Sequence, residues 1–406
     1  MKILFLQKRI LFPVDTGWRI RTLNVLKHLA RWHDVTYLCN LQSCEEEFVP
    51  AMRELGVRLE TIPWRETPRG GVGFYRDLLL NVFSPYPFTV NKDYDRRLRR
   101  RADELLSEET YDLVVCDFVQ MARNVVGLQG PPKLLFQHNV EAEIFRRHAA
   151  NGRSGPRRGY MTLQSRKMRR FEAHAGEQFD GIVAVSERDR ETFTSEYGWR
   201  HVHTIDTAVD TDYFQPNGCP KQSDRLVFVG SMDWLPNIDA ARHFVRDIWP
   251  HIRASRGQAK FQLVGRNPDA AVQRLSDVGG VDVVGTVPDV RPYLAEASVV
   301  VVPLLVGGGT RIKIFEAMAM GNAVVSTSLG AEGLDVQPGK HIELADSPKE
   351  FADKVLELLE NSERRKQLGS EAQGHVCRNF SAEAVARQFE HICLHLARSE
   401  SIATTV

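Results

Sequence analysis

The chain has 406 residues, whereas single hydrophobic cores stop growing at about 250–300 residues, so two domains are expected. Hydrophobic residues make up 43% and charged residues 26% of the chain, a globular composition that excludes disordered and fibrous proteins. The net charge is only +1, which argues against a general nucleic-acid-binding protein.

The cysteines and the apolar runs bear on the location of the protein. No two of the six cysteines are spaced as C-x-x-C, which favours reduced, buried thiols over a metal or redox site. The N-terminal run Ile3–Leu6 is too short for a signal peptide, and no stretch approaches the ~18 apolar residues of a transmembrane helix. We therefore expect a cytoplasmic protein that is soluble or bound peripherally at the inner face of the cytoplasmic membrane.

The first half of the chain alternates short apolar runs with helical patterns. A run at 2–6 precedes a loop, and Ile20, Leu23, Leu26 and Leu29 then recur at helical spacing before the next apolar run at 34–39. Helical stretches near 91–108, 140–178 and 187–197 separate further strand candidates at 57–62, 111–117, 133–139, 181–186 and 201–206. Runs without polar alternation are typical of parallel strands that helices cover on both faces.

The same alternation restarts after a polar, turn-rich segment at 215–223, which we interpret as a linker. Strand candidates follow at 224–230, 260–265, 281–285, 298–304 and 323–327, with a helix from about 237 to 255. The sequence thus predicts an α/β protein of two Rossmann-like, doubly wound parallel-sheet domains, at 1–210 and 222–380. The last helix, at about 381–398, is a candidate to pack back on the first domain.

A glycine loop between two buried strands of the second half is the sharpest feature of the sequence. Gly307, Gly308 and Gly309 permit positive φ angles and close approach of a ligand to the backbone, and a helix is expected from Thr310 to Gly321. The free N–H groups and positive dipole end of that helix favour an anion.

Arg311 and Lys313 add two cations to the first turn of the helix. Cations there oppose the helix dipole by about 0.3–1 kcal/mol each, and a bound diphosphate would remove that cost. Glu316, one turn later, could accept hydrogen bonds from both hydroxyls of a ribose. The alternative is a surface pair between Lys313 and Glu316 beside an ordinary glycine turn. The segment matches neither a Walker A loop nor G-x-G-x-x-G, which disfavours a P-loop kinase or a simple dinucleotide enzyme.

The motif from Glu316 to Gly321, E-A-M-A-M-G, followed by a strand ending at Thr327, resembles the donor-site core of retaining GT-B glycosyltransferases of family 4, of the bacterial cell-surface glycan type. Further segments that resemble this family extend the likeness over about residues 2–395, at 13–35, 207–216, 227–240 and 287–303. The resemblance implies a GT-B fold, with two facing domains and an interdomain cleft that holds the active site.

The resemblance implies a hexosyltransferase that moves a sugar from a nucleoside diphosphate donor to a glycan or lipid-linked acceptor in surface polysaccharide biosynthesis. Retention at the anomeric carbon is implied with it. No D-x-D metal pair stands at a strand end, and fixed cations with glycine amides can stabilise a departing diphosphate, so we expect no metal and no cofactor. The expected partners are a nucleotide sugar and the acceptor, without nucleic acid.

The resemblance also implies site residues. His138, Arg311 and Lys313 are the expected catalytic residues, with His138 beside the transferred sugar. Donor contacts are expected from Gly230, Ser231, Gly265, Arg266, Val287, Gly308, Gly309, Thr310, Arg311, Lys313 and Glu316. The acceptor loop is expected at Asp15, Thr16 and Gly17. For the segment after the strand at 133–139, the alternative is that Asn139 caps the next helix, and Asp117 is interpreted as a helix cap.

Two departures from the family pattern keep alternatives open. The first of the two glutamates that the family spaces eight residues apart is replaced by Gly308, and no Arg–Lys pair follows Gly230. We infer that Arg311 and Lys313 take over the cationic role. The alternatives are a non-catalytic nucleotide-sugar-binding protein and a sugar-nucleotide 2-epimerase.

Basic segments at 95–101 and 146–170 stand near an apolar and aromatic segment at 74–90. Together they could hold the first domain on an anionic membrane, since each cation contributes about 1 kcal/mol near the lipid. The alternative is an ordinary solvated helix face.

Overall fold

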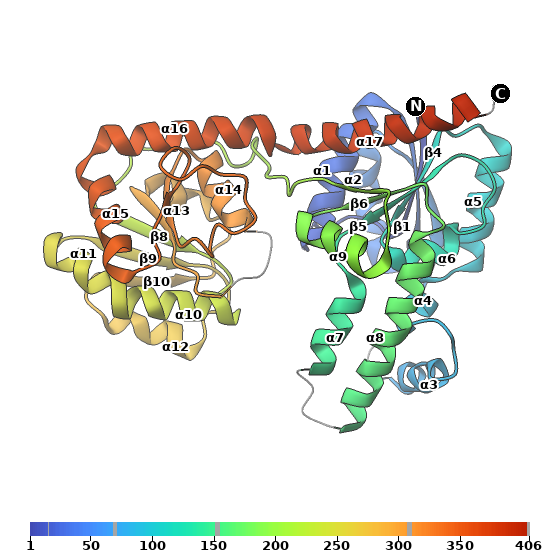
Figure 1. Ribbon diagram of the computed structural model, residues 1–406, viewed down its shortest axis with the longest axis horizontal. Helices are drawn as coiled ribbons and strands as arrows, with labels where there is room; N and C mark the ends of the chain where they lie inside the picture. The colour runs from blue at the N-terminus through green and yellow to red at the C-terminus, as the bar shows by residue number, and fades with distance from the viewer. Residues whose placement is uncertain (15, 68–70, 151–154, 307–310, 404–406) are drawn as a thin grey trace. The chain divides into compact units, whose positions relative to one another are not determined.

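The computed structural model describes residues 1–403 except 15, 68–70, 151–154 and 307–310. The chain forms two compact units. Unit 1 contains the residues up to Asp206 together with the chain from Val385 onward, and unit 2 contains Thr207–Ala384 (Figure 1). Each unit is a parallel sheet covered by helices, as the sequence predicts. None of the helices in the described ranges is both long enough and apolar enough to cross a membrane.

The sheet of unit 1 has seven parallel strands in the order β3-β2-β1-β4-β5-β6-β7. The strands are β1 Lys2–Arg9, β2 Asp34–Leu41, β3 Arg58–Pro63, β4 Leu113–Asp117, β5 Lys133–Gln137, β6 Gly181–Ala184 and β7 Val202–Thr204. The order reverses between β1 and β4. The carboxyl ends of these two strands therefore form the switch point at which ligands bind in open parallel sheets.

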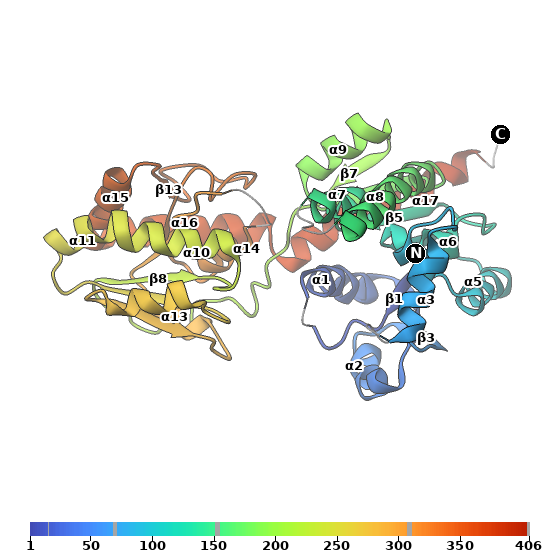
Figure 2. The ribbon, with the colours of Figure 1, turned by 90° about the horizontal axis from the view of Figure 1, so that it is seen from below.

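The helices of unit 1 follow its strands in alternation (Figure 2). They are α1 Gly17–Trp32, η1 Ser43–Phe48, α2 Val49–Glu54, α3 Val72–Asn81, α4 Phe88–Asp93, α5 Arg96–Glu108, η2 Val119–Met121, α6 Ala122–Val125, α7 Glu141–Ala150, α8 Gly155–Gly176 and α9 Glu187–Tyr197. The single helices expected near 91–108 and 140–178 are each two helices.

The C-terminal helix α17, Ala382–Ala403, belongs to unit 1 from Val385 onward and packs on its sheet. The ring of Phe389 meets that of Phe136 of β5 edge-on, with centroids 5.0 Å apart. The carboxylate of Glu390 lies 2.8 Å from Nε2 of His33. Gly181 on β6 leaves room for Leu396, because a Cβ there would lie 2.6 Å from the Leu396 Cδ1. Residues far apart in sequence therefore share one core.

The sheet of unit 2 has six parallel strands in the order β10-β9-β8-β11-β12-β13, which reverses between β8 and β11. The strands are β8 Arg225–Val229, β9 Lys260–Val264, β10 Val281–Gly285, β11 Val299–Val302, β12 Ala323–Ser326 and β13 Glu343–Leu344. The helices are α10 Leu235–His243, η3 Phe244–Ile248, α11 Trp249–Ser255, α12 Ala270–Gln273, η4 Arg274–Asp277, α13 Arg291–Glu296, α14 Ile312–Ala319, α15 Pro348–Glu360 and α16 Ser362–Asn379. Figure 2 shows α10 and α13 on opposite sides of β8.

The helix expected from about 237 to 255 is interrupted by the π-helical turn η3. Pro250, at the start of α11, has no N–H to donate to the preceding turn, and a π-turn accommodates that missing bond. The turn directs Phe244 and Trp249 into the core of unit 2, where both meet the ring of Phe261.

Candidate active site

Two glycines bring the backbones after β8 and β9 into direct contact. Gly230 follows β8 and donates its N–H to the Val264 carbonyl at 3.0 Å. A Cβ at Gly265 would lie 1.7 Å from the Gly230 oxygen, and the φ angle of Gly265 is +153°. Both observations require glycine at 265. The predicted donor residues Gly230 and Gly265 are therefore adjacent.

Lys313 occupies the space that Gly230 leaves open. A Cβ at Gly230 would lie 2.8 Å from the Lys313 Nζ, which donates to Oδ1 of Asn237 at 2.7 Å and lies 4.8 Å from the centre of the Phe228 ring. Burial lowers the pKa of Lys313 to about 8, against the opposing influence of the Glu316 carboxylate. An ammonium has three hydrogens, so the bond to Asn237 leaves others for a ligand.

Asn237 is a site residue that the sequence analysis did not identify. Its buried side chain accepts from Lys313 and donates from Nδ2 to the Ser231 carbonyl at 2.9 Å. The Oγ of Ser231 in turn accepts from Nε of Arg266 at 2.9 Å. The structure thus brings together the predicted residues Gly230, Ser231, Gly265, Arg266 and Lys313, with Asn237 at their centre. The sequence indicates Asn237 only through its position in 227–240, one of the segments that resemble the family.

Glu316 lies one turn beyond Lys313 on α14, and its side chain is partly buried. Burial raises the pKa of Glu316 to about 7, and the Lys313 charge acts in the opposite direction. The two groups do not form the surface ion pair considered as the alternative, since both are largely buried and no salt bridge joins them within the described residues. Burial thus lowers the pKa of the amine and raises the pKa of the carboxyl group in the same site.

Arg311 precedes α14 in the left-handed conformation, with φ +51°. Its buried guanidinium donates from Nη2 to the Leu329 carbonyl at 3.0 Å and lies 3.9 Å from the Glu332 carboxylate. Arg311 therefore fixes the loop after β12. The predicted Gly308, Gly309 and Thr310 lie outside the described residues.

The loop after β10 is held by its own contacts. Val287 is partly buried against the core of unit 2. The guanidinium of Arg291 donates from Nε to both carboxylate oxygens of Asp289 and from Nη2 to Oδ2, and it stacks 3.7 Å from the centre of the Tyr213 ring.

His138 of unit 1 is fully buried just after β5, next to the switch point. Its Nε2 lies 2.6 Å from Oδ1 of Asp117, and its ring lies between Phe118 and Phe136, with centroids 4.4 Å from each. Its Nδ1 has no hydrogen-bond partner among the described residues. One ring nitrogen of His138 is thus engaged and the other is available for a hydrogen bond.

Asp117 is not a helix cap, contrary to the expectation. Its Oδ2 accepts from Nε2 of Gln7 at 2.6 Å and from the hydroxyl of Thr22 at 2.8 Å, while Oδ1 holds His138. Strand β1, helix α1 and the end of β5 are therefore tied to one buried carboxylate. The sequence could not show this, because the partners stand 21 to 110 residues from Asp117.

Glu172, and not Asn139, binds the N–H groups at the start of α7. The Glu172 carboxylate accepts from the N–H groups of Glu141 and Ala142 at 3.0 and 3.2 Å and from the Tyr197 hydroxyl at 2.9 Å. Burial raises the pKa of Glu172 to about 8, although those N–H groups lower it. The segment after His138 is therefore anchored by an acid from α8.

The predicted acceptor loop connects β1 to α1. Thr16 is the N-cap residue of α1 but makes no side-chain capping bond, and the position of a Cβ on Gly17 is open. Arg19 donates to the Pro13 carbonyl at 2.8 Å. Asp15 lies outside the described residues.

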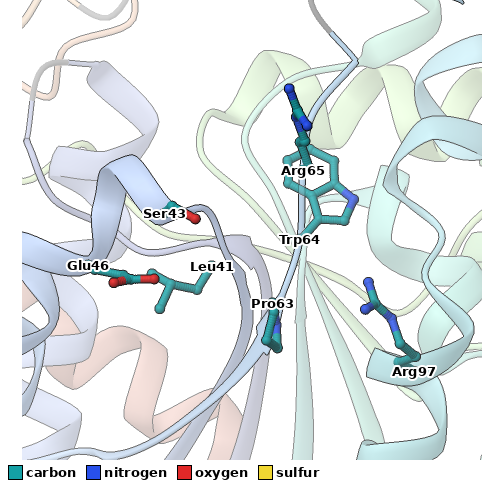
Figure 3. Close-up of a pocket in the computed structure, with 7 residues that line it drawn as sticks. All are labelled: Leu41, Ser43, Glu46, Pro63, Trp64, Arg65 and Arg97. Carbon is teal, nitrogen blue, oxygen red and sulfur yellow. The ribbon is translucent and has the colours of Figure 1, made fainter.

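A pocket of about 370 Å³ opens at the carboxyl ends of β2 and β3 (Figure 3). Trp64 and Arg65 lie on one side, and Ser43 and Glu46 lie on the other. The backbone N–H of Trp64 donates to the Leu41 carbonyl at 2.8 Å, which fixes the backbone of Trp64. An aromatic face beside charged and hydroxyl groups suits a sugar ring. No motif in the sequence indicates these residues.

Two family models match the chain. The model of glycosyltransferase family 4 matches residues 17–213, and that of glycosyl transferases group 1 matches residues 223–361. The chain belongs to the family 4 glycosyltransferases. This confirms the family and enzyme class expected from the sequence.

Solved glycosyltransferase structures confirm the GT-B fold of this family 4 enzyme. Sucrose-phosphate synthase of Thermosynechococcus elongatus superposes with a TM-score of 0.64 at 16% identity, over 98% of this chain and 99% of the other. Anabaena HepE in complex with UDP and glucose gives a TM-score of 0.60 at 16% identity, over 96% and 98%. An uncharacterised 44.6 kDa protein in the cps region of Klebsiella pneumoniae is 21% identical over 398 residues, which are 95% of this chain and 97% of that protein.

Proposed function

We propose that the enzyme transfers a hexosyl group from a nucleoside diphosphate sugar to a glycan or lipid-linked acceptor in surface polysaccharide biosynthesis, with retention and without a metal ion. The observation that carries the proposal is the Lys313 amine, held by Asn237 in the space beside Gly230. The HepE complex with UDP and glucose, which shares the fold, supports a nucleotide sugar as donor.

In the proposed reaction the bond between the anomeric carbon and the diphosphate oxygen breaks, and its electron pair stays on that oxygen. The acceptor hydroxyl oxygen bonds to the anomeric carbon on the same face, and its proton passes to the departing phosphate. Lys313 stabilises the growing negative charge, since a preorganised cation can do so without reorganising. Glu316 binds the ribose hydroxyls.

His138 is proposed to hydrogen-bond the transferred sugar through Nδ1, while Asp117 fixes the ring through Nε2. Because the His138 side chain is covered, this contact requires the neighbouring rings to shift. We place an acceptor sugar on the face of Trp64, in the pocket at the ends of β2 and β3.

A thermal-shift screen against UDP-, GDP-, ADP- and dTDP-sugars in EDTA tests the donor assignment. A ligand at 100 times its Kd stabilises the protein by about 2.7 kcal/mol, an easily detected shift. We expect one base to give that shift in EDTA. No shift with any donor would contradict the proposal. If one donor does give a shift, its slow hydrolysis by the protein would distinguish a transferase from a binding protein. Conversion of that donor to its 2-epimer would instead indicate an epimerase.

A further inference from the structure

Helix α3 of unit 1 exposes an apolar face that the fold does not cover. Six of the thirteen exposed large hydrophobic residues in the described chain lie between Val72 and Phe83, so the exposure is concentrated there. Val72, Tyr75 and Leu79 are spaced by three or four residues and therefore share one face of α3, and Phe83 lies in the turn that follows the helix. Val72 is 88% exposed, Phe83 86% and Leu79 67%. Contiguous exposed apolar surface of this kind marks an interaction site.

The opposite side of α3 is firmly attached to unit 1. The Phe74 ring meets that of Phe88 edge-on at 5.7 Å. Nε2 of Gln164 on α8 donates to Oδ1 of Asn81 at 2.8 Å, and Nζ of Lys167 donates to the Asn81 and Val82 carbonyls at 2.6 and 3.0 Å. These bonds close the C-terminal end of α3. The apolar face is thus presented outward by a fixed helix.

Basic side chains accompany this face. Arg76 lies on α3 with an exposed side chain that pairs with Asp77 of the same helix at 3.3 Å, whereas α8 carries exposed Arg158, Arg166 and Arg170. None of these three α8 arginines forms an ion pair with an acidic side chain in the ranges that the structure describes. The one acidic residue of α8, Glu172, is buried. Figure 1 shows α3 beside α8, to which it is joined by the hydrogen bond between Gln164 and Asn81.

Four of the five arginines of α5, a helix that the sequence also suggested for a membrane contact, are engaged within unit 1, Arg100 through an exposed pair with Glu104. Arg99 donates to the Arg123 and Val126 carbonyls at 3.0 and 2.8 Å. Arg97 pairs with Asp95, and Arg101 pairs with Glu60 and Glu108. The cations of α8 are therefore better placed than those of α5 to meet an external anion.

We propose that α3 and Phe83 insert into the surface of an anionic lipid bilayer, with the α8 arginines at its headgroups. A helix with an apolar face and neighbouring cations binds such a surface through buried apolar area and attraction to anionic lipid. Tyr75 matches the interfacial preference of aromatic rings with a polar end. A second copy of the chain is the less favourable occupant, because like-charged arginines flank the face on both copies. This inference goes beyond the proposed function and does not depend on it.

Vesicle co-sedimentation of the full chain tests the proposal without donor or acceptor. The probes are vesicles of phosphatidylcholine alone and of phosphatidylcholine with 30% phosphatidylglycerol. We expect binding only to the anionic vesicles. Leu79→Glu with Phe83→Glu should lower the partition coefficient at least tenfold. Leu235→Glu, a control at a residue of unit 2 that is 65% exposed, should leave it within twofold.

A second pair of variants tests how much the arginines of α8 contribute to vesicle binding. Arg166→Gln with Arg170→Gln should weaken binding to anionic vesicles by about tenfold or more, from the usual contribution of each cation near lipid. Arg246→Gln, an exposed arginine of unit 2, is the matched control. All variants change exposed side chains, so their thermal unfolding should match that of the wild type.

Three outcomes would overturn the proposal. The first is a wild type that does not bind anionic vesicles. The second is that the double variant Leu79→Glu, Phe83→Glu binds these vesicles as well as the wild type does. The third is that light scattering shows a wild-type dimer, and that the same double variant is monomeric but still binds vesicles. Because no donor is present, none of these outcomes depends on the transferase proposal.

Discussion

The Nζ of Lys313 lies 2.7 Å from Oδ1 of Asn237, and this bond joins α14 to α10 at the carboxyl end of β8. The amide also binds the Ser231 carbonyl, so one buried side chain sets the positions of a cation and of a loop. Both contacts depend on Gly230, where a side chain would displace the amine and the amide. The cation of the proposed diphosphate site is therefore positioned before a donor arrives.

Asn237→Ala should weaken donor binding about tenfold, because the Lys313 amine loses the group that fixes it. Leaving the Ser231 carbonyl without its donor should also cost about 1–3 kcal/mol of the free energy of unfolding. Calorimetry with the donor and urea unfolding measure the two effects. Asn237→Asp keeps the acceptor, so it should retain more affinity than the alanine variant. Equal affinity of wild type and alanine variant would contradict the role of Asn237.

Donor affinity should fall as the pH rises above about 8, because the Lys313 amine of the free protein then loses its proton. The loss approaches tenfold per pH unit once the pH exceeds that pKa. Isothermal titration from pH 7 to 9.5 measures it. Lys313→Arg should bind with no such dependence, since arginine stays charged. A wild-type affinity that is constant over this range would exclude Lys313 as a phosphate ligand.

The lowered pKa of Lys313 makes the free energy of unfolding change with pH in the direction opposite to donor affinity. The unfolded chain keeps the Lys313 amine charged up to its usual pKa of 10.5. Between pH 8 and 10.5 the unfolded state therefore binds more protons, and raising the pH adds to the free energy of unfolding. Lys313→Met should remove this contribution.

Gly265→Ala should destabilise unit 2 severely, because the new Cβ would lie 1.7 Å from a backbone oxygen at a positive φ angle. We expect a loss of at least about 3 kcal/mol, at the upper end of single substitutions. Urea unfolding measures it. Gly257→Ala is the control, since no atom lies within 4 Å of its Cβ position, and it should change stability little.

Glu172→Leu should destabilise unit 1 by about 3 kcal/mol or more, since two backbone N–H groups and the Tyr197 hydroxyl would stay buried without an acceptor. Glu191→Leu on α9 is exposed and serves as the control. Chemical unfolding of both variants decides the matter: similar stabilities would show that water replaces the carboxylate.

Trp64→Ala should raise the acceptor KM while leaving the donor Kd unchanged, because Trp64 lines the pocket proposed for the acceptor and is not among the residues proposed to bind the donor. Loss of an aromatic stacking face costs about 1 kcal/mol, or roughly a fivefold change. Initial rates against acceptor concentration measure it. Trp64→Phe keeps a ring and should recover most of the affinity. A changed donor Kd would point to a different location for the acceptor.

The sheets and the glycine positions could be predicted from the sequence because their signals are local. Uninterrupted runs such as Val299–Val302 are typical of strands buried on both faces, and Gly230 and Gly265 follow such runs directly. The family motifs predicted the family for the same reason.

The contacts that organise the sites could not be predicted, because their partners are distant in the sequence. Asn237 meets Lys313 across 76 residues, and Gln7 meets Asp117 across 110. Glu172 stands in a basic helix, where an acid normally faces solvent, and only tertiary packing buries it. The apolar segment at 74–90 is a candidate for membrane contact, but which of its residues are exposed depends on the packing of α3 against α4 and α8.

The contact of Phe389 with Phe136 has a consequence for biosynthesis. The chain completes the first sheet, then the whole of unit 2, before it reaches the helix that covers part of that first sheet. During translation, part of the apolar surface of the N-terminal half therefore stays uncovered while the 178 intervening residues, Thr207–Ala384, are synthesised. At about 5–20 residues per second this delay is on the order of ten seconds or more, long enough for a chaperone to bind.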